Sequence, residues 1–390
     1  MRLAVNLGYF GGGSGTGGGD RSSLELAVEA DRLGYAACWV AEAYGSDAPT
    51  VLAWVAARTE RIDIGSAVMQ IPARSAAMTA MTAATLDALS GGRFRLGLGV
   101  SGPQVSEGWH GVRFDEPLAR TREYVDVVRL ALARCRVEYA GRHLVLPLPD
   151  GPGKALRLTV HPVREHVPLY LAAVGPRSLE LTGEIADGWL GVFFAPEHAA
   201  ASLDHLRAGR LRAAPDPAAP AAAAGSAHPA GPAGPPNRAD PADPADADPL
   251  AGFDVCPSVP VAVDDDVEAA ADLLRGYYAL YVGGMGSREQ NFYHRLAVRM
   301  GFGDAAETVQ DLYLAGRHRE AAAAVPTELV DATALIGPPE RVTGRIGAFE
   351  EAGVTTLTVV PFAADSAGLA GRLRTLHVAD EAARAAGVLR

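Results

Sequence analysis

The stretch from Arg61 to Gly111 constrains the fold most, because two short apolar runs flank a helical pattern in it. The runs Ile62–Val68 and Phe94–Leu98 are bounded by polar residues or glycine, which predicts two buried strands. The residues between them that recur at helical spacing are Met78, Met81, Leu86 and Leu89. Gly91-Gly92 offers a left-handed cap for the end of that helix. A strand, helix, strand crossover favours a parallel sheet.

The second of these strands ends in Gly99-Val100-Ser101-Gly102. Such small residues let backbone N–H groups approach a flat ring or a phosphate. Sites in parallel α/β folds lie at the carboxyl ends of strands. The sequence therefore predicts a binding segment here.

Strand patterns recur near residues 3, 37, 63, 95, 168, 189, 258 and 357, separated mostly by helical patterns. Eight parallel units favour a single (β/α)8 TIM barrel over an open sheet. The length of 390 residues and the 48% hydrophobic content allow one barrel domain over residues 1–390, with insertions. The stretch from Arg212 to Leu250 consists largely of Pro and Ala, so it cannot offset its ordering entropy by burial, and we expect a disordered surface insertion.

Composition excludes several classes of partner. A net charge of −11 without a basic block argues against nucleic acid and against an anionic membrane. Cys38, Cys135 and Cys256 form no Cys-x-x-Cys pair, which favours a reducing cytoplasm. No apolar run reaches membrane-spanning length, no signal peptide begins the chain, and no metal-ligand cluster is evident. We therefore expect a soluble cytoplasmic protein without a metal site.

The glycine-rich run Gly11–Gly19 allows a different fold. Gly13 to Gly18 satisfies a dinucleotide fingerprint by glycine density, and Glu42 stands where a ribose-binding acid would lie. The match begins several residues beyond the first strand rather than at its turn, so we favour a mobile loop or a slack connection over a Rossmann fold.

Two side chains are candidates for proton transfer. Glu42 follows the predicted strand 36–41, and it could equally be a solvated loop acid. His110 lies in a long loop at 103–111, where Trp109 and His110 could close over a bound ring. His110 is the only side chain of that loop that titrates near neutrality, although a loop histidine can also be merely exposed.

Two glycine turns are candidate anion sites. The turn at Val174-Gly175-Pro176 opens a helix, whose N-terminus attracts anions; an ordinary strand-to-helix turn is the alternative. The segment Gly283–Arg288 could bring Arg288 to an anion, or it could simply be a helix-breaking loop.

Several short motifs together resemble one family, and the likeness spans nearly the whole chain except the Pro/Ala insertion. They are Trp39–Glu42, Gly65–Val68, Ser90–Arg93 followed by Gly97–Gly99, Leu171–Pro176 and Ala186–Trp189. In this order and spacing they resemble the bacterial luciferase-like TIM-barrel superfamily. The resemblance is closest to its branch dependent on coenzyme F420, which includes methylenetetrahydromethanopterin reductase-like enzymes.

The resemblance implies roles for named residues. A bulge at Ala67-Val68, with a non-proline cis peptide bond, would support the deazaflavin ring from behind, and Val174-Gly175-Pro176 would bind the cofactor phosphate. Glu42 would lie near the ring. Glucose-6-phosphate dehydrogenases of this branch have Asp-His where this chain has Glu42-Ala43 and Glu where it has Gly102, so sugar-phosphate oxidation is in doubt.

Three functions remain open. The favoured one is an F420-dependent oxidoreductase, with FMN as the alternative cofactor, that transfers a hydride to or from a small organic substrate and is a homodimer. The second is a reduced-FMN monooxygenase that uses oxygen. The third is a barrel that binds the cofactor without catalysis. With no nucleophile elbow or triad in the sequence, a redox cofactor would carry the reaction.

Overall fold

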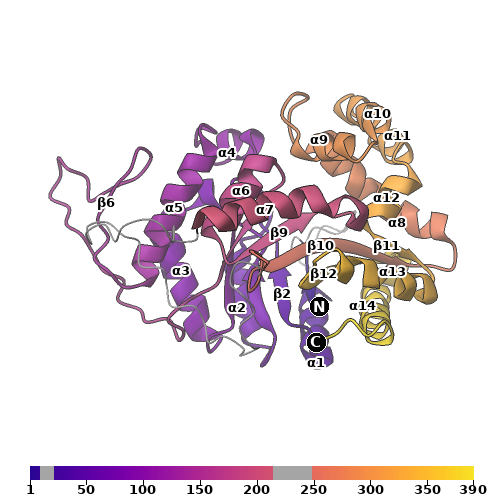
Figure 1. Cartoon of the computed structure of the whole chain (residues 1–390), viewed down its shortest axis with the longest axis horizontal. Coiled ribbons are helices and arrows are strands. Elements are labelled where there is room, and N and C mark those ends of the chain that lie inside the picture. Colours follow the sequence, from indigo (N-terminus) through magenta and orange to yellow (C-terminus); the bar gives the residue numbers. More distant parts are fainter. Residues whose placement is uncertain (9–21, 214–247) are drawn as a thin grey trace.

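The computed structural model describes residues 1–8, 22–213 and 248–390. Eight parallel strands form a closed barrel at the centre of the molecule (Figure 1). They are β1 (Arg2–Asn6), β2 (Ala37–Val40), β3 (Asp63–Ser66), β5 (Phe94–Gly99), β8 (Leu169–Ala172), β9 (Gly188–Val192), β10 (Asp254–Val263) and β12 (Thr356–Phe362). β10 closes the ring by pairing with β9 and β12, and β12 pairs with β1. The predicted TIM barrel is confirmed.

Helices surround the barrel. The helices of the repeating strand–helix units are α1 (Ser22–Leu33), α2 (Ala48–Ala56), α3 (Ala76–Leu89), α5 (Pro117–Leu132), α6 (Pro176–Ile185), α7 (Ala199–Ala213), α8 (Val267–Ala279), α13 (Pro339–Glu351) and α14 (Gly368–Ala385). Four shorter helices follow α8, namely α9 (Phe292–Arg299), α10 (Gly303–Leu314), α11 (His318–Ala323) and α12 (Thr327–Thr333). No helix among the described residues is long and apolar enough to cross a membrane.

Some elements were not predicted. β4 (Met69–Gln70) pairs with β5, and β11 (Leu335–Gly337) pairs with β10. The strands β6 (Tyr139–Ala140) and β7 (Val145–Leu146) form an antiparallel hairpin that extends from the barrel at the left of Figure 1. The loop expected at 103–111 contains the short helix α4 (Pro103–Gly108), so that expectation was wrong; Pro103 is suited to a first helical turn because its ring fixes φ.

Two predicted features lie wholly or mostly outside the described residues. The glycine-rich run 11–19 is one of them. The other is the Pro/Ala insertion, of which only the two ends are described. At one end α7 continues through Ala213, and at the other Asp248 forms an ion pair with Arg207 at 3.1 Å. Leu250 is also buried in the main core.

The interior of the barrel, next to Ala67 and Val68, holds a compact apolar cluster. Trp39, Tyr170, Leu190 and Cys256 meet there, and the rings of Trp39 and Tyr170 stand edge to face at 5.1 Å. Gly65 is required beside Trp39, since a Cβ at this position would come within 2.3 Å of the indole ring. The interior is therefore filled with side chains, as expected for an eight-stranded barrel.

A buried polar network closes the amino-terminal end of the barrel. The Asp254 carboxylate accepts hydrogen bonds from the Arg95 guanidinium at 3.1 Å, the Tyr170 hydroxyl at 2.9 Å and the Thr356 hydroxyl at 2.8 Å. Arg95 also donates to Asp63 at 2.8 Å. Burial alone would raise the pKa of Asp254, but the positive charges of Arg2 and Arg95 hold it below its usual range. We call this polar network, whose groups are paired with one another, the floor of the barrel. The cavity described below lies at the opposite end, where the strands have their carboxyl ends.

The helix α3 has its predicted position but presents an unexpected face. Ala76, Ala80 and Ala83 are buried, whereas Met78 and Met81 are about half exposed. The small alanine side chains let α3 pack closely on its neighbours, so the larger side chains point outward. Of the four apolar residues that the sequence analysis placed on this helix, Leu86 lies in the core, whereas Met78, Met81 and Leu89 form an exposed stripe.

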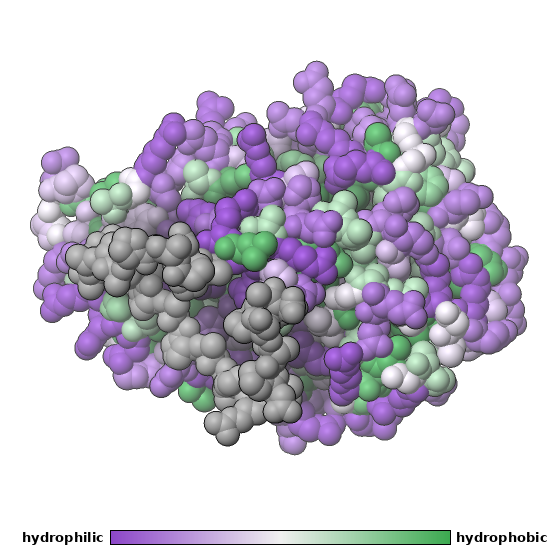
Figure 2. Space-filling model, viewed as in Figure 1, coloured by the Kyte–Doolittle hydropathy of each residue, from purple (hydrophilic) through white to green (hydrophobic). Residues whose placement is uncertain are grey.

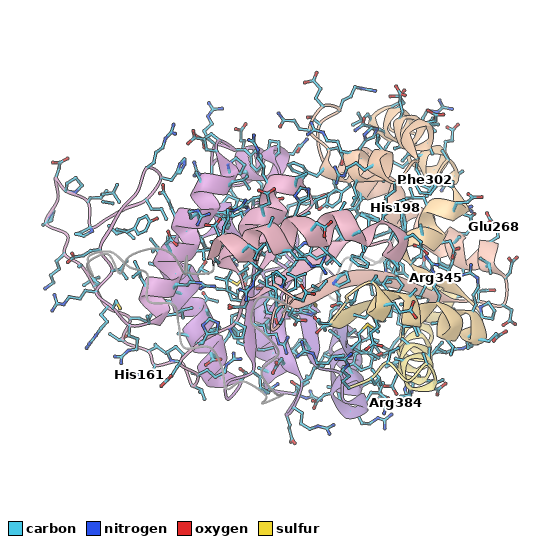
Figure 3. The ribbon with its side chains drawn as sticks, in the orientation of Figure 1. His161, His198, Glu268, Phe302, Arg345 and Arg384 are labelled. Carbon is cyan, nitrogen blue, oxygen red and sulfur yellow. The ribbon has the colours of Figure 1, made fainter. Side chains whose placement is uncertain are left out.

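A second apolar cluster lies among α8 to α12, at the right of Figure 1, apart from the main core around the barrel. Phe302, labelled in Figure 3, packs against its edge. The face of the molecule seen in Figure 2 is mostly hydrophilic, with apolar residues in small scattered areas. The helices α8 and α9 of this second cluster contribute to the cavity described next.

Candidate active site

A cavity of about 2010 Å³ lies at the carboxyl ends of the barrel strands. All the residues that the sequence predicted for the cofactor line it, namely Ala67, Val68, Gly99, Val100, Ser101, Gly102, Val174, Gly175 and Pro176. Glu42 lines it as well. Segments more than a hundred residues apart in the chain thus meet in one site. The location agrees with the rule that TIM-barrel active sites lie at this end.

The bulge after β3 forms the inner wall of the cavity. The peptide bond between Ala67 and Val68 is cis, as predicted from the family resemblance. The Val68 side chain packs over Gly99, where a Cβ would come within 2.5 Å of Val68 Cγ2. Glycine at 99 is therefore needed for the close approach of β5 to the bulge, and the two segments together form a continuous surface of small side chains.

A chain of hydrogen bonds runs along the polar side of the cavity. Ser101 has a φ of 61°, in the left-handed region, and its hydroxyl donates to Gln70 Oε1 at 2.5 Å. The Gln70 amide donates in turn to the Ala43 carbonyl at 2.6 Å. The ends of β5, β4 and β2 are thereby linked, which fixes their spacing around the cavity.

The Glu42 side chain is only 6% exposed and accepts hydrogen bonds from several donors. Arg74 binds it bidentately at 2.6 and 2.9 Å, and the backbone N–H of Ala48 donates at 3.0 Å. The backbone N–H of Gln70 approaches at 3.4 Å. Arg74 also pairs with Asp47, the N-cap of α2. Glu42 therefore orients Arg74 and the backbone of β4, and it would have to release a contact to act on a proton of a substrate.

His110 does not line the cavity, nor does Trp109, whose side chain is 67% exposed. The His110 Nε2 atom is buried without a hydrogen-bond partner among the described residues. The short helix α4 instead places Gln104 and Val105 at the cavity. The closure of Trp109 and His110 over a ring remains a prediction.

The turn before α6 forms another side of the cavity. Gly175 is the N-cap of α6, and its N–H donates to Ser178 Oγ at 3.1 Å. From α9, the Arg299 guanidinium donates to the Val174 carbonyl at 3.3 Å. The N-terminus of a helix carries a partial positive charge, so the turn and Arg299 both favour an anion here.

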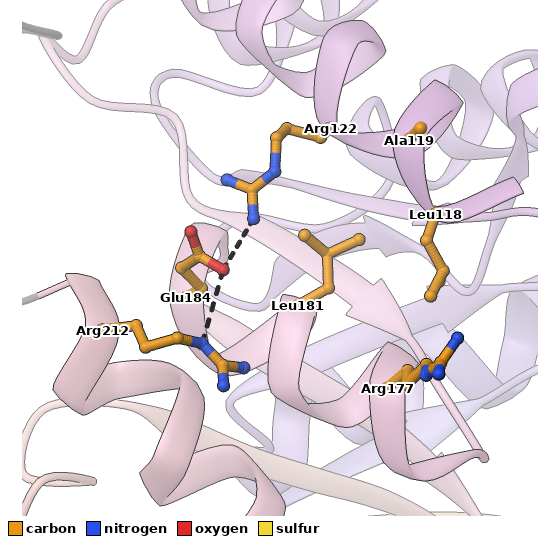
Figure 4. Close-up of a pocket in the computed structure, with 7 residues that line it drawn as sticks. All are labelled: Leu118, Ala119, Arg122, Arg177, Leu181, Glu184 and Arg212. Carbon is orange, nitrogen blue, oxygen red and sulfur yellow. Dashed lines mark hydrogen bonds and ion pairs between the residues drawn. The ribbon is translucent and has the colours of Figure 1, made fainter. Parts of the chain in front are cut away.

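A small pocket of about 240 Å³ adjoins this turn (Figure 4). Glu184 lies between Arg122, at 2.6 Å, and Arg212, at 3.9 Å. Arg177 stands across from that ion pair and lines both the small pocket and the main cavity. Arg212 also pairs with Glu180 at 3.0 Å, so among the described residues Arg177 is the arginine of this pocket that has no carboxylate partner.

Aromatic side chains from α8, from the helical segment Leu280–Gly284 that follows it, and from α9 form the wall opposite the bulge, and the sequence analysis did not identify them. Tyr277, Tyr281 and Tyr293 line the cavity and pack around Phe193, with ring centroids 5.4 to 5.8 Å from it. The spacing of Tyr277 and Tyr281 by one helical turn was the available signal. Arg288, the anion candidate of the glycine segment, instead pairs with Asp311 and does not line the cavity.

The profile of the luciferase-like monooxygenase family matches residues 1–231 and 239–356 of the chain. The chain belongs to this family. A Mycobacterium tuberculosis member, provisionally assigned as a coenzyme F420-dependent oxidoreductase, is 39% identical over 381 residues, which cover 96% of this chain and 98% of that protein.

Two solved structures share the luciferase-like fold. The coenzyme F420-dependent tetrahydromethanopterin reductase of Methanopyrus kandleri has a TM-score of 0.72 at 21% identity, with 97% of each chain covered. The oxygenating constituent of a Pseudomonas putida diketocamphane monooxygenase, in complex with FMN, has a TM-score of 0.65 at 18% identity, with coverage of 100% of this chain and 99% of that one. Among the described residues of this luciferase-like chain, no group of three or more His, Cys, Asp or Glu side chains could hold a metal ion.

Proposed function

We propose that the protein is a coenzyme F420-dependent oxidoreductase, which transfers a hydride between the deazaflavin and a small organic substrate. The observation that carries the proposal is the single cavity formed by all the residues expected to contact the cofactor. A relative provisionally assigned to F420, which matches along 96% of the chain, supports the choice of cofactor.

The cavity has the shape and charge that such a cofactor requires. The small side chains of Ala67 and Val68, packed on Gly99, offer a flat surface for a ring. The turn at Val174-Gly175-Pro176, with the positive end of α6, suits the phosphate of the cofactor. When bound, the deazaflavin supplies the hydride chemistry, and the role of the chain is to hold the ring and the substrate in register.

Glu42 is the first candidate for the side chain that transfers a proton near the ring. Its carboxylate is held by Arg74, so a proton reaches it only when one of its present contacts opens. Such a change is expected when a charged ring binds beside it. His110 is the second candidate, and it requires the α4 segment to move toward the cavity.

The aromatic wall is suited to the apolar part of the substrate. Tyr277, Tyr281 and Tyr293 face the cavity from the side opposite the bulge. A substrate between this wall and the ring would be shielded from water, which favours hydride transfer over side reactions. Loop side chains decide which compound fits.

A binding titration tests the proposed function. Purified protein is titrated with F420 and with FMN, and tryptophan fluorescence is followed. We expect F420 to bind at least tenfold more tightly. Preferential binding of FMN together with oxygen uptake on turnover would refute the proposal in favour of a monooxygenase. Tight F420 binding without redox change across a panel of alcohols, ketones and enones would favour a non-catalytic barrel.

We also propose that the protein is a homodimer. The exposed stripe of α3 contains Met78, Met81 and Leu89, with exposed fractions of 49%, 50% and 65%. Val163, also exposed, lies beside Gly92 just beyond the end of this helix. Apolar side chains gathered on one face commonly mark a protein interface. Light scattering coupled to size-exclusion chromatography should give twice the monomer mass, and Met81→Glu should reduce it to the monomer mass.

A further inference from the structure

Two arginines on α9 face the cavity without a carboxylate partner. Arg295 and Arg299 are one helical turn apart, and both line the cavity. The guanidinium of Arg295 donates to the Glu289 carbonyl, and that of Arg299 donates to the Val174 carbonyl. No described Asp or Glu lies within ion-pair distance of either. By contrast, Arg74, Arg95 and Arg164 each pair with a carboxylate elsewhere in the fold.

The two guanidiniums are close enough to repel each other. Burial and the positive charge of Arg295 both lower the pKa of Arg299. Like charges on successive turns of a helix destabilise it slightly unless a counter-charge is present. A bound anion would supply that counter-charge and would remove this destabilisation of α9.

A third arginine approaches the same place from α6. Arg177 is exposed, lines both the main cavity and the small pocket, and has no ion-pair partner among the described residues. Figure 4 shows it separate from the ion pair that Glu184 forms with Arg122 and Arg212. Because Arg299 contacts Val174, the end of α9 lies directly against the turn that precedes Arg177. All three side chains are exposed as well as cavity-lining, so they lie where the cavity meets solvent.

We propose that Arg295, Arg299 and Arg177 form an anion site at the mouth of the cavity, which binds a phosphate or carboxylate group of a ligand whose flat part lies deeper, against Val68 and Gly99. This inference rests on the proposed function in so far as the ligand is F420. The anion is then the phosphate or the acidic tail of the cofactor. The same chemistry would also accept an anionic group of a substrate, and the experiment separates the two sources.

The test compares wild type with the double variant Arg295→Gln and Arg299→Gln. The matched control is Arg288→Gln, from the neighbouring segment, whose arginine pairs with Asp311 and does not line the cavity. Dissociation constants are measured by fluorescence for F420 and for the same deazaflavin without its phosphate and glutamate tail. A third titration uses inorganic phosphate with the protein already saturated with the tail-less deazaflavin. Thermal unfolding checks that the variants remain folded.

We expect the double variant to bind F420 at least tenfold more weakly, because it loses two charge-assisted hydrogen-bond donors. Its affinity for the tail-less deazaflavin should equal that of wild type, and Arg288→Gln should change neither. The F420 deficit should also shrink as NaCl rises from 50 to 500 mM. An unchanged F420 affinity with loss of phosphate binding would support the site and assign its anion to the substrate.

Equal affinities of wild type and the double variant for F420 and for phosphate would overturn the inference. So would an equal loss of affinity for F420 and for the tail-less deazaflavin. Failure of the proposed function gives a different result, in which wild type binds neither deazaflavin and binds FMN. In that event the dissociation constants of FMN and of riboflavin, which lacks the phosphate of FMN, are compared in wild type and the double variant to test the same anion site.

Discussion

Replacing Asp254 by Asn should destabilise the protein strongly, because it breaks the buried network at the floor of the barrel. The carboxylate is surrounded by donors: Arg95, Tyr170, Thr356, the Thr355 hydroxyl at 2.5 Å and Arg2 at 3.0 Å. An asparagine keeps the shape but presents an NH2 group to some of these donors. Asp63 would then be the remaining carboxylate partner of Arg95.

The structure sets the size of the effect. Removing one partner of a buried ion pair costs about 3 to 5 kcal/mol. The side chains of Arg2 and Asp63 are 41% and 25% exposed, so water can compensate in part, and we expect about 3 kcal/mol. Against a typical stability of about 5 to 15 kcal/mol this is a large loss. Urea unfolding, followed by circular dichroism at pH 7, measures it.

Asp311→Asn is the matched control. Asp311 pairs with Arg288 on the surface, where both side chains are more than half exposed, and loss of such a pair costs about 0.5 kcal/mol or less. The Asp254 effect should also depend on pH in a defined direction. Its pKa is lowered from 3.8 in the folded protein, so its contribution is present above pH 3.8 and is lost as the pH falls through the lowered value. If the two variants unfolded at the same urea concentration, the stabilising role of the floor would be refuted.

Three further predictions concern the site and the insertion. Gly99→Ala should weaken cofactor binding at least tenfold in a fluorescence titration, because its Cβ meets the bulge at 2.5 Å, whereas Gly344→Ala, on α13 outside the cavity and with no atom within 4 Å of the added Cβ, should bind normally. Glu42→Gln should lower the rate of hydride transfer in stopped-flow absorbance by roughly 10² to 10⁴ if Glu42 moves a proton, and an unchanged rate would exclude that role. Replacing residues 214–247 by a short Gly/Ser linker should preserve the melting temperature and cofactor binding, whereas a replacement that extends through the buried Leu250 should lower the melting temperature.

The barrel strands were predictable because each is a compact apolar run with glycine or polar boundaries, a signal that is local in the sequence. Short strands such as Leu335–Gly337 were not, since three residues carry no periodicity and become a strand only through pairing with β10. The exposed face of α3 was also missed. Leu86 packs inward as its spacing suggested, but Met78, Met81 and Leu89 point outward, because alanines fill the rest of the buried face and allow close contact with neighbouring elements.

The backbone part of the site was predictable for a similar reason. Gly99 and Gly175 mark places where a side chain is excluded or a turn begins, and family resemblance added the cis bond after Ala67. The arginines of α9 were not predictable, because Arg299 reaches a carbonyl 125 residues earlier in the chain. Only the folded chain brings α9 to the turn before α6.

The two sides of the cavity come from different parts of the chain, which has an evolutionary consequence. Residues 42–102 and the turn at Val174-Gly175-Pro176 form the side expected to hold the cofactor, and hydrogen bonds through Gln70 and Ser101 tie its strands together. The opposite side, from Leu273 to Tyr293, lies outside the barrel and is built around packed aromatic rings. Mutations in this second segment can change which compound fits and leave the cofactor side intact. A lineage built on this chain could therefore acquire new substrates by drift within residues 273–293 alone, with Arg295 and Arg299 retained and its redox chemistry inherited unchanged.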